Sequence, residues 1–270
     1  MEYFDNHCHY DDEKFDGDRE QLIEDVFNSG VTRMISAGYS LQGSKNSIAL
    51  ARKYPYIYST VGISPNDINE NYKNELIEIE ELLKNRTQED KIVAIGEIGL
   101  DYHYDTPIEI QKEVFIKQIE YANKYDFPIV IHTRDAVMDT LSILKEHSVN
   151  KKGIFHCCPL NRELVKEGLK LGFYISFSGI VTFKNSHGEE IAKQVPDDRF
   201  LIETDAPYLS PEPVRGTRND SRNLKYIVKK IAEFKEISEE KVAKMSYENA
   251  NKIYNIKQHV NYWFFIMILL

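Results

Sequence analysis

Two histidines stand close together near the start of the sequence, in the segment Asp5-Asn6-His7-Cys8-His9. A short strand pattern at residues 3–5 leads into this segment. Alternate side chains of an extended chain point to the same face, so His7 and His9 project together. Two neutral imidazole nitrogens placed side by side can share one divalent cation. An H-x-H pair is equally compatible with two unrelated histidines, so a metal site requires further ligands from later in the chain.

Four more residues with ligand-type side chains come at the ends of later apolar segments. Glu97 follows Ile-Val-Ala-Ile-Gly, His132 follows Pro-Ile-Val-Ile, His156 follows Gly-Ile-Phe, and Asp205 comes shortly after the apolar segment 200–202. A charged or imidazole group at the end of a buried strand is costly unless it is paired or bound to a metal.

Each of these four residues has a simpler explanation when it is taken alone. His132 or His156 could be a hydrogen-bonded core histidine, Glu97 could be half of an ion pair, and Asp205 could cap a turn. The joint occurrence of four histidines and two carboxylates favours a two-metal centre in which one carboxylate bridges the ions.

The elements that must position these residues alternate strictly between short apolar strands and amphipathic helices. The strands are expected at residues 3–5, 31–35, 57–62, 91–95, 128–131, 153–155, 173–177 and 200–202. The helices are expected at residues 18–29, 41–53, 74–84, 108–125, 136–147, 161–171, 188–195, 222–234 and 238–254.

This alternation predicts an α/β protein with parallel strands, and eight strands indicate a closed (β/α)₈ TIM barrel. An open doubly wound sheet is the alternative, but the sequence has neither G-x-G-x-x-G nor G-x-x-x-x-G-K-[ST]. We expect one barrel domain over residues 1–256. Active sites of this barrel lie at the carboxyl ends of the strands, so the six ligand-type residues are expected to meet in one bowl.

Composition restricts the range of possible partners. The chain has 270 residues, 42% hydrophobic and 29% charged, with a formal net charge of −9. Such a surface repels a polyanion, so nucleic-acid binding would require a local patch or bound metal cations. Three cysteines, two of them adjacent, form no disulfide framework, and no basic segment followed by an apolar one opens the chain. We therefore expect a cytoplasmic protein, and we expect it to be a monomer.

The last residues, 257–270, form an apolar tail whose role the sequence does not define. The run 262–270 is uncharged. A membrane-spanning helix needs about 20 apolar residues, so no stable membrane insertion is expected from this tail.

Two arginines are candidates for contact with an anionic substrate. Arg134 lies two residues beyond His132 and is expected to point toward the same bowl. Arg215 follows Asp205 in a loop that is equally compatible with a solvated surface and with a phosphate contact.

Five ordered motifs closely resemble the TatD family of metal-dependent deoxyribonucleases. They are Asp5-Asn6-His7-Cys8-His9, Gly96-Glu97-Ile98-Gly99-Leu100-Asp101-Tyr102, His132-Thr133-Arg134-Asp135-Ala136, His156-Cys157 and Glu203-Thr204-Asp205-Ala206-Pro207-Tyr208-Leu209. The resemblance covers roughly residues 3–255 and implies an amidohydrolase-like barrel. It also implies one metal among His7, His9, Glu97 and Asp205, and a second among Glu97, His132 and His156.

Two departures from the family pattern affect the pocket more than the metal ligands. The family usually has His-Pro-His after the third strand, where this chain has Ser64-Pro65-Asn66. After His156-Cys157 the family tends to have Phe-Ser-Gly, and here the residues are Cys158-Pro159-Leu160. Ser64 and Asn66 are therefore expected to alter substrate handling.

The resemblance implies hydrolysis of DNA phosphodiester bonds, with exonuclease-like action on single-stranded or damaged DNA. Two cations (Mg²⁺, Mn²⁺ or Zn²⁺) would lower the pKa of a shared water toward about 7 and supply hydroxide. Asp205 would orient that hydroxide and accept its proton, and Arg134 would bind the phosphate. Glu203 would position Asp205 without itself binding the metal. Two alternatives stay open: a metal-dependent hydrolase of a small ester, amide or lactone, and a non-catalytic metal-binding scaffold.

Overall fold

Eight parallel strands form a single sheet in the computed structural model, which describes residues 1–257. The strands follow one another around the sheet in chain order. Their bounds are β1 Tyr3–Cys8, β2 Val31–Ser36, β3 Ile57–Val61, β4 Ile92–Asp101, β5 Ile129–Arg134, β6 Gly153–Phe155, β7 Tyr174–Phe177 and β8 Phe200–Ile202. The predicted strand positions and the α/β class are confirmed.

The sheet closes on itself where β1 and β8 meet. Cys8 and Ala206 form a parallel bridge, the amide of His9 donates to the carbonyl of Ala206 at 2.7 Å, and the amide of Asp205 donates to the carbonyl of His7 at 2.9 Å. The first and last strands are thereby joined, and the sheet is the nearly closed (β/α)₈ barrel that the sequence predicts. The closure also brings the first motif of the chain next to the last one.

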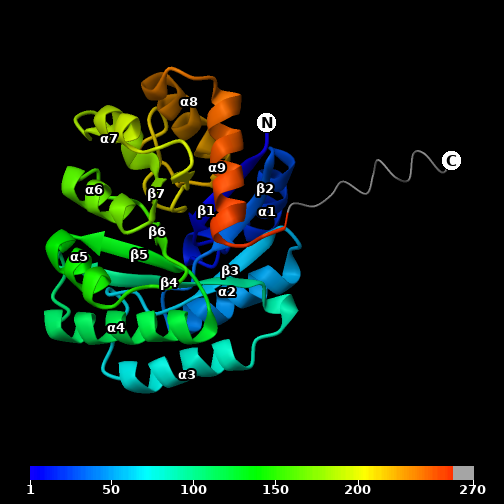
Figure 1. Cartoon of the computed structure of the whole chain (residues 1–270). Helices are drawn as coiled ribbons and strands as arrows, with labels where there is room; N and C mark the ends of the chain where they lie inside the picture. The colour runs from blue at the N-terminus through cyan, green and yellow to red at the C-terminus, as the bar shows by residue number, and fades with distance from the viewer. Residues whose placement is uncertain (258–270) are drawn as a thin grey trace.

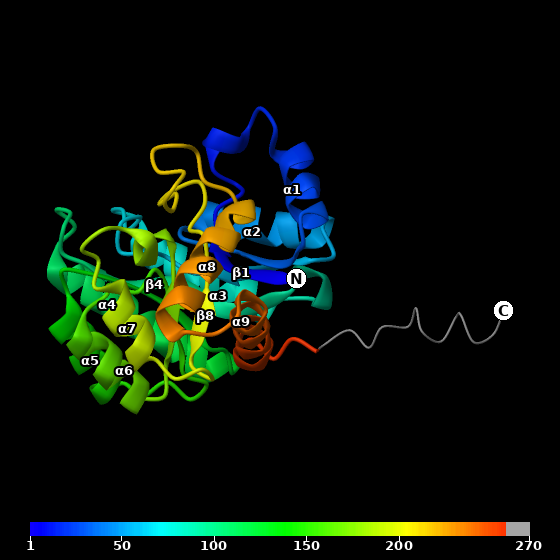
Figure 2. The same cartoon turned by 90° about the horizontal axis from the view of Figure 1, so that it is seen from above.

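Helices connect successive strands and cover the outside of the barrel (Figures 1 and 2). The α-helices are α1 Arg19–Asn28, α2 Leu41–Lys53, α3 Tyr72–Lys84, α4 Ile108–Tyr125, α5 Val137–Glu146, α6 Arg162–Lys170, α7 Gly188–Gln194, α8 Leu224–Lys235 and α9 Glu239–Ile253. Short 3₁₀ turns occur at Glu13–Phe15, Gln88–Asp90, Gly179–Thr182 and Ser221–Asn223. Within residues 1–257, no helix is both long and apolar enough to cross a bilayer.

Two strands are longer than the hydrophobic pattern predicts. The sequence predicts that β4 ends at residue 95, but the strand continues to Asp101. It also predicts that β5 ends at residue 131, but that strand continues to Arg134. The two extensions pair with each other, with Gly99 opposite His132 and Asp101 opposite Arg134. Polar residues at the mouth of the barrel break the apolar pattern, but the backbone ladder continues there. His132 therefore lies inside the paired ladder, and Glu97 lies within β4 at the irregularity between Ile95 and Ile98. Both belong to strands and are held more rigidly than residues of a loop.

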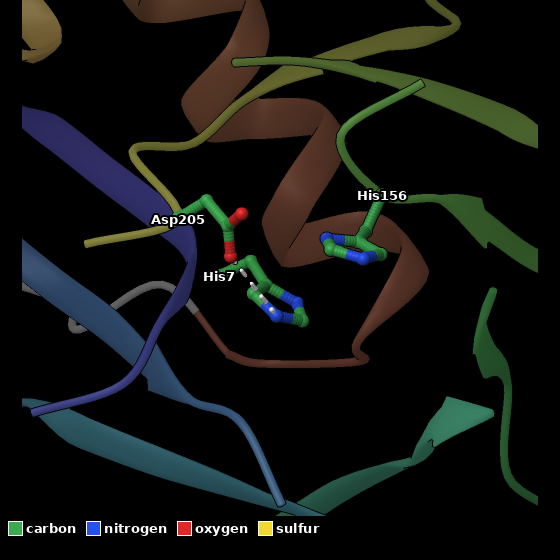
Figure 3. Close-up of side chains that lie close together, drawn as sticks. All are labelled: His7, His156 and Asp205. Atoms are coloured by element: carbon green, nitrogen blue, oxygen red, sulfur yellow. Dashed lines mark ion pairs between the residues drawn. The ribbon is translucent and has the colours of Figure 1, made fainter. Parts of the chain in front are cut away.

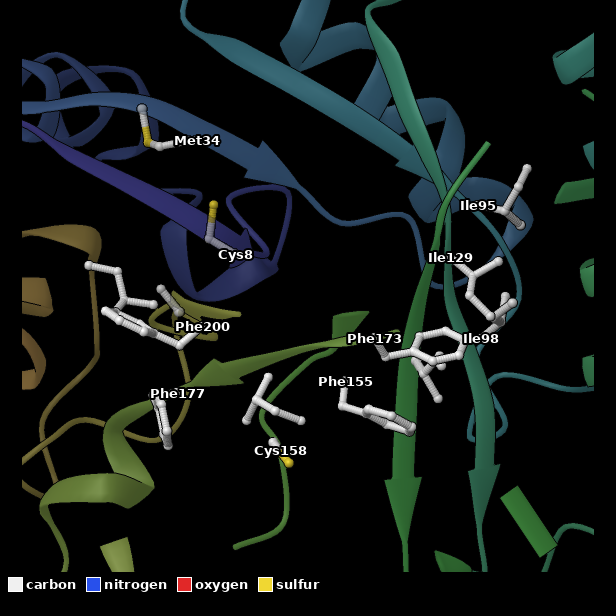
Figure 4. Packing of buried hydrophobic residues seen from close by; sticks show 14 of the residues in the cluster. Cys8, Met34, Ile95, Ile98, Ile129, Phe155, Cys158, Phe173, Phe177 and Phe200 are labelled. Atoms are coloured by element: carbon white, nitrogen blue, oxygen red, sulfur yellow. The ribbon is translucent and has the colours of Figure 1, made fainter. Parts of the chain in front are cut away.

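The apolar core has two parts. The larger part packs the outer faces of the strands against the helices; Figure 4 shows some of its members, including Phe155, Phe173, Phe177 and Phe200. The smaller part draws residues from all eight strands and so fills the inside of the barrel: Phe4, Ile35, Tyr58, Val93, Ala94, Val130, Ile154, Tyr174 and Leu201. Tyr254 and Ile256, which follow α9, pack against this inner layer and seal it. The filled interior makes the carboxyl-end bowl a closed-bottomed cavity.

The predicted boundary between a barrel at residues 1–256 and an apolar tail at residues 257–270 stays a prediction. Residues 258–270 lie outside the part of the chain that the structure describes.

Candidate metal centre

A cavity of about 820 Å³ opens at the carboxyl ends of the strands. Its lining includes five of the six predicted ligand-type residues, namely His9, Glu97, His132, His156 and Asp205. The sixth, His7, is 1% exposed and lies in the floor beneath them. The structure thus brings together side chains that are up to 198 positions apart in the sequence (His7 and Asp205).

His7 and His9 project side by side, as the alternation of an extended strand requires. Their Nε2 atoms are 3.1 Å apart. The Nε2 of His7 is 3.2 Å from Oε2 of Glu97, and the Nε2 of His9 is 3.4 Å from Oδ1 of Asp205. Two imidazoles and two carboxylate oxygens therefore face one another in a space the size of a single ion.

Glu97 turns its second oxygen toward the other two histidines. Its Oε1 is 3.1 Å from Nδ1 of His132 and 3.5 Å from Nε2 of His156. Those two nitrogens are themselves 3.3 Å apart. Glu97 therefore lies between two groups of imidazoles with one oxygen toward each, which is the position of a bridging carboxylate.

Asp205 reaches the centre from the turn that follows β8. Its backbone has φ 56°, the left-handed region in which Asp is tolerated better than most residues. Its Oδ1 lies 3.7 Å from Nε2 of His7, and Figure 3 shows Asp205, His7 and His156 converging from three different segments. The rings of His7 and His156 stack with centroids 3.9 Å apart.

The donor set fits divalent metal ions. Three groups have ligand atoms that all lie within 4.8 Å of one another: His7, His9 and Glu97; Glu97, His132 and His156; and His7, His156 and Asp205. Ligands at about 2.1 Å from one ion are separated by up to roughly 4.2 Å, so these spacings need little adjustment. Three buried imidazoles and the partly buried one of His132 would also repel one another if they were all protonated. Neutral nitrogen donors around a cation explain this arrangement better than a structural hydrogen-bond network.

The charges of the centre support one another electrostatically. Burial by itself raises the pKa of the Glu97 carboxyl, but His156 and hydrogen bonds from His132 and His7 outweigh it and hold that pKa well below its usual value. Burial likewise lowers the pKa of His9, yet the hydrogen bond to Asp205 and the charges of Asp205 and Glu97 raise it to about 9. When no metal cation is bound, a protonated His9 therefore supplies the positive charge between the two carboxylates.

Asp101 supports the centre from behind His132, a role that the sequence motifs did not reveal. Its Oδ2 is 2.9 Å from Nε2 of His132. The amide of Asn66 donates to the same oxygen at 3.2 Å, and the backbone amide of His103 donates to Oδ1 at 2.9 Å. Asp101 is 1% exposed and lies four positions after Glu97 on β4. This even spacing along an extended strand, which puts both carboxylates on one side, was the available signal.

Asp5 supports the other half of the centre in the same way. It is fully buried, and its carboxylate accepts from the amide of His7 at 3.3 Å and from the amide and hydroxyl of Thr204 at 3.0 and 2.5 Å. Asp5 therefore ties β1 to the segment that carries Asp205. Its even spacing from His7 could have indicated this role.

Glu203 does not hold Asp205, contrary to the sequence-based expectation. It is completely buried, and its Oε1 lies 3.3 Å from Nδ1 of His156 and also accepts from the backbone amide of Cys157. Glu203 directly follows β8 and meets Nδ1 of His156 and the amide of Cys157, whereas Asp205, in the left-handed region, meets the Nε2 atoms of His7 and His9. Glu203 therefore orients His156.

The remaining predicted pocket residues divide into two groups. Ser64, Asn66 and Arg134 line the cavity, whereas Arg215 is not among its lining residues. The guanidinium of Arg215 instead lies 3.8 Å from the ring centroid of Phe183. Of the two readings of the Arg215 loop, the structure thus favours a surface loop, because a cation–π contact holds the side chain outside the cavity.

Aromatic side chains form much of the rim of the cavity, which the sequence analysis did not predict. Tyr39, Tyr104 and Tyr208 all line it. Tyr104 and Tyr208 are 53% and 43% exposed, and Arg134 lies over the ring of Tyr104 at 5.7 Å. Exposed ring faces beside a cation can stack with planar groups of a ligand.

Comparisons with known proteins agree with this geometry. The sequence profile of the family described as "TatD related DNase" matches residues 4–255. The chain is 41% identical over 256 residues to YabD of Bacillus subtilis, described as an uncharacterized metal-dependent hydrolase, covering 94% of this chain and 99% of YabD. It is 34% identical over 259 residues to YcfH of Escherichia coli strain K12, with the same description, covering 93% and 95%.

Among solved structures, the crystal structure of YJJV, described as a TatD homolog from Escherichia coli K12, is similar with a TM-score of 0.88 and 25% identity. The alignment covers 94% of this chain and 98% of that one.

Proposed function

The chain belongs to the TatD-related DNase family, and from this premise we propose that it is a divalent-metal-dependent hydrolase that cleaves phosphodiester bonds in DNA. The observation that carries the proposal is the position of Glu97, whose two oxygens face two separate groups of histidines. A bridged pair of cations about 3.5–4 Å apart is a common arrangement for hydrolysis of phosphate esters.

The proposed ligands divide between two ions. His7, His9, Glu97 and Asp205 would hold one, and Glu97, His132 and His156 would hold the other. When bound, such ions act as Lewis acids toward phosphoryl oxygens and lower the pKa of water toward about 7. Their identity stays open, since histidine and carboxylate ligands suit Zn²⁺ and Mn²⁺, and Mg²⁺ is compatible with the carboxylates.

The side chains of the chain itself would orient the reactants and move the proton. Asp205 has one carboxylate oxygen in the centre, and its pKa is held below the usual value by His9, His156 and His7 despite burial. It is therefore ionised at neutral pH and can accept a proton from the attacking water. Arg134, at the rim of the same cavity, would contact a non-bridging oxygen of the phosphate.

Features of the cavity favour an unpaired nucleic-acid strand as substrate. Tyr104 and Tyr208 are partly exposed at the cavity, with Arg134 over one ring and Lys14 over the other, and the uncovered ring faces could stack against unpaired bases in a way that tolerates any sequence. With a protein charge of −9, attraction of the anionic strand would depend on the cations and on Arg134. We therefore propose exonuclease-like action at the ends of single-stranded or damaged DNA.

The test is digestion of a 5′-labelled single-stranded oligonucleotide by the purified protein with Mg²⁺, Mn²⁺ or Zn²⁺, with and without a chelator. Metal-dependent release of mononucleotides is the expected result. Turnover of small esters, amides or lactones without DNA cleavage would instead identify the alternative hydrolase. If the protein is fully loaded with metal but hydrolyses neither DNA nor the small substrates, it is a non-catalytic metal-binding scaffold.

A further inference from the structure

A second large cavity lies at the amino end of the barrel, opposite the metal centre. Its volume is about 1190 Å³. Its walls come from the turns that lead into β4, β5, β6, β7 and β8 and from the residues at the end of α9 and beyond it. Its floor includes Val93, Tyr174, Tyr254 and Ile256, members of the sealed inner layer of the barrel. We call this cavity the amino-end bowl.

The amino-end bowl is strongly cationic although the protein is acidic. Its lining contains six basic residues and a single acidic one, Asp126; the basic residues are Lys91, Lys151, Lys152, Arg199, Lys252 and Lys257. Ion pairs neutralise two of the six: Lys151 pairs with Asp126 at 3.0 Å, and Arg199 pairs with Asp198 at 2.8 Å. The other four have no acidic partner within 4 Å among residues 1–257.

Three of these cations occupy equivalent positions in the barrel. Lys91, Lys152 and Arg199 are the residues directly before β4, β6 and β8. In a barrel of this kind alternate strands contribute side chains to the same layer. The three backbone positions therefore lie around the bowl at one level, and two of them, Lys91 and Lys152, carry a charge that no acidic residue among residues 1–257 neutralises.

At two of these positions lysine has a backbone conformation that costs free energy. Lys91 and Lys152 have φ values of 44° and 61°, in the left-handed region that favours glycine. At two other turns into strands the chain does use glycine: Gly30 and Gly172 have φ values of 104° and 90°. Strained residues of this kind cluster at functional sites.

The environment of Lys91 supports the same interpretation. Its ammonium donates to the carbonyl of Tyr54 at 2.6 Å and lies 5.8 Å from the ring centroid of Tyr58. Burial lowers the pKa of Lys91 to about 8. An anion bound beside it would offset this burial effect and stabilise the charged form.

We propose that the amino-end bowl binds a compact anion with several phosphate groups, such as a nucleoside triphosphate or inorganic tripolyphosphate. A concave site with converging lysines suits a small multivalent anion better than an extended strand, which would follow a groove. The rings of Tyr58 and Tyr174 also line the bowl, with Lys91 over the first at 5.8 Å and Arg199 over the second at 5.3 Å, so they hold two of the cations in place rather than offering free faces to a base. This inference does not depend on the proposed nuclease activity, because the bowl and the metal centre lie at opposite ends of the barrel.

The test is calorimetric titration of the full chain with tripolyphosphate, dATP and a single-stranded oligonucleotide whose phosphorothioate linkages resist hydrolysis at the metal centre. A fixed excess of the divalent ion that the protein carries prevents the probes from removing metal. The key variant is Lys152→Gly, which removes one cation and relieves the left-handed backbone at that position. Lys229→Gln on α8, outside the bowl, removes the same charge and serves as the control.

The expected result is that tripolyphosphate or dATP binds and that Lys152→Gly weakens binding roughly fivefold at low salt, while Lys229→Gln binds as the wild type does. The melting temperature of Lys152→Gly should equal or exceed that of the wild type, which excludes misfolding as the cause. If dATP binds more tightly than tripolyphosphate, the bowl also contacts the base. If the two bind equally, the bowl recognises the phosphate groups alone. Unchanged binding in Lys152→Gly, no binding of either compact probe, or binding of the oligonucleotide only would overturn the proposal.

Discussion

The imidazole of His132 is clamped between two carboxylates, with Asp101 Oδ2 at 2.9 Å from its Nε2 and Glu97 Oε1 at 3.1 Å from its Nδ1. Asp101 is fixed in turn by the amide of Asn66 and the backbone of His103. A carboxylate behind a histidine fixes which nitrogen carries the proton and raises the basicity of the other. The two carboxylates raise the pKa of His132 in the metal-free centre, and when an ion is bound the Asp101 contact would keep the proton on Nε2 and leave Nδ1 free to coordinate.

Replacing Asp101 with Asn should weaken one of the two proposed metal positions selectively. Loss of such a supporting carboxylate lowers metal affinity by about 10–100-fold. The ion held by His132 and His156 should be affected, while the ion held by His7 and His9 should not. Metal titration with elemental analysis of both occupancies measures this difference. Asp105→Asn, an exposed carboxylate in the following loop, is the matched control; equal weakening of both ions would contradict the assignment.

Asp205→Asn should abolish hydrolysis without removing the ions. The amide keeps an oxygen donor near His9 but cannot accept a proton, and loss of a general base lowers kcat by about 10²–10⁴-fold. Steady-state digestion of single-stranded DNA, together with the metal content of the same sample, separates the two effects. Asp12→Asn changes another carboxylate that lines the cavity and should retain activity. Wild-type kcat in the Asp205 variant would show that the proton goes elsewhere.

Metal affinity should rise with pH, and metal binding should release protons. In the metal-free centre, hydrogen bonding to Asp205 and the charges of Asp205 and Glu97 hold the pKa of His9 at about 9, and the charges of Glu97 and Glu203 hold the pKa of His156 well above its usual value. Both histidines are therefore protonated at neutral pH and must lose those protons to coordinate an ion.

Since protons and cations compete, the dissociation constant should decrease by up to about tenfold per pH unit for each proton displaced, as the pH approaches 9 from below. Titrations at several pH values, repeated in buffers of different ionisation enthalpy, count these protons. An affinity that does not change between pH 6 and 8 would mean that the ions bind elsewhere.

The sequence predicted the architecture and the six central residues because both depend on local patterns. Apolar strands alternate with amphipathic helices. Each ligand-type residue lies at the end of an apolar run, where burial of a polar group costs free energy unless the group is paired or binds a metal. The contact of Glu203 could not be predicted in this way. It depends on which neighbours the folded barrel brings next to Glu203, and the contact to His156 on another strand is not encoded in the local pattern.

The full lengths of β4 and β5 also could not be predicted from the pattern of apolar residues. Their extensions to Asp101 and Arg134 contain polar residues, and these extensions are stabilised because the two neighbouring strands pair with each other, which is a tertiary effect. The even spacing of Asp101 from Glu97 becomes a usable signal only once β4 is known to extend to Asp101, so the supporting role of Asp101 was missed for the same reason.

Arg134 and Arg215 should behave differently when each is replaced by Gln. Arg134 lines the cavity above the centre, whereas Arg215 lies against Phe183 outside it. Loss of a charge-assisted contact to a phosphate should raise KM for DNA about tenfold in Arg134→Gln. Arg215→Gln should leave KM within about twofold, and it is the control for the loss of one positive charge. If both variants raise KM equally, the effect is a general attraction of the strand rather than a contact in the cavity.

Gly153→Ala should destabilise the barrel strongly, because the start of β6 has no space for a side chain. A Cβ at this position would lie 2.0 Å from the carbonyl oxygen of Ile129 and 2.8 Å from its nitrogen, atoms of the neighbouring strand β5. Since backbone cannot move aside as a flexible side chain can, the β5–β6 pairing that positions His132 and His156 would have to separate. A loss of at least about 3 kcal/mol in the free energy of unfolding is expected. Gly17→Ala, where a Cβ meets no atom within 4 Å, is the matched control for the same chemical change. Chemical denaturation of both variants measures the difference, and similar stabilities would show that the two strands can separate at little cost.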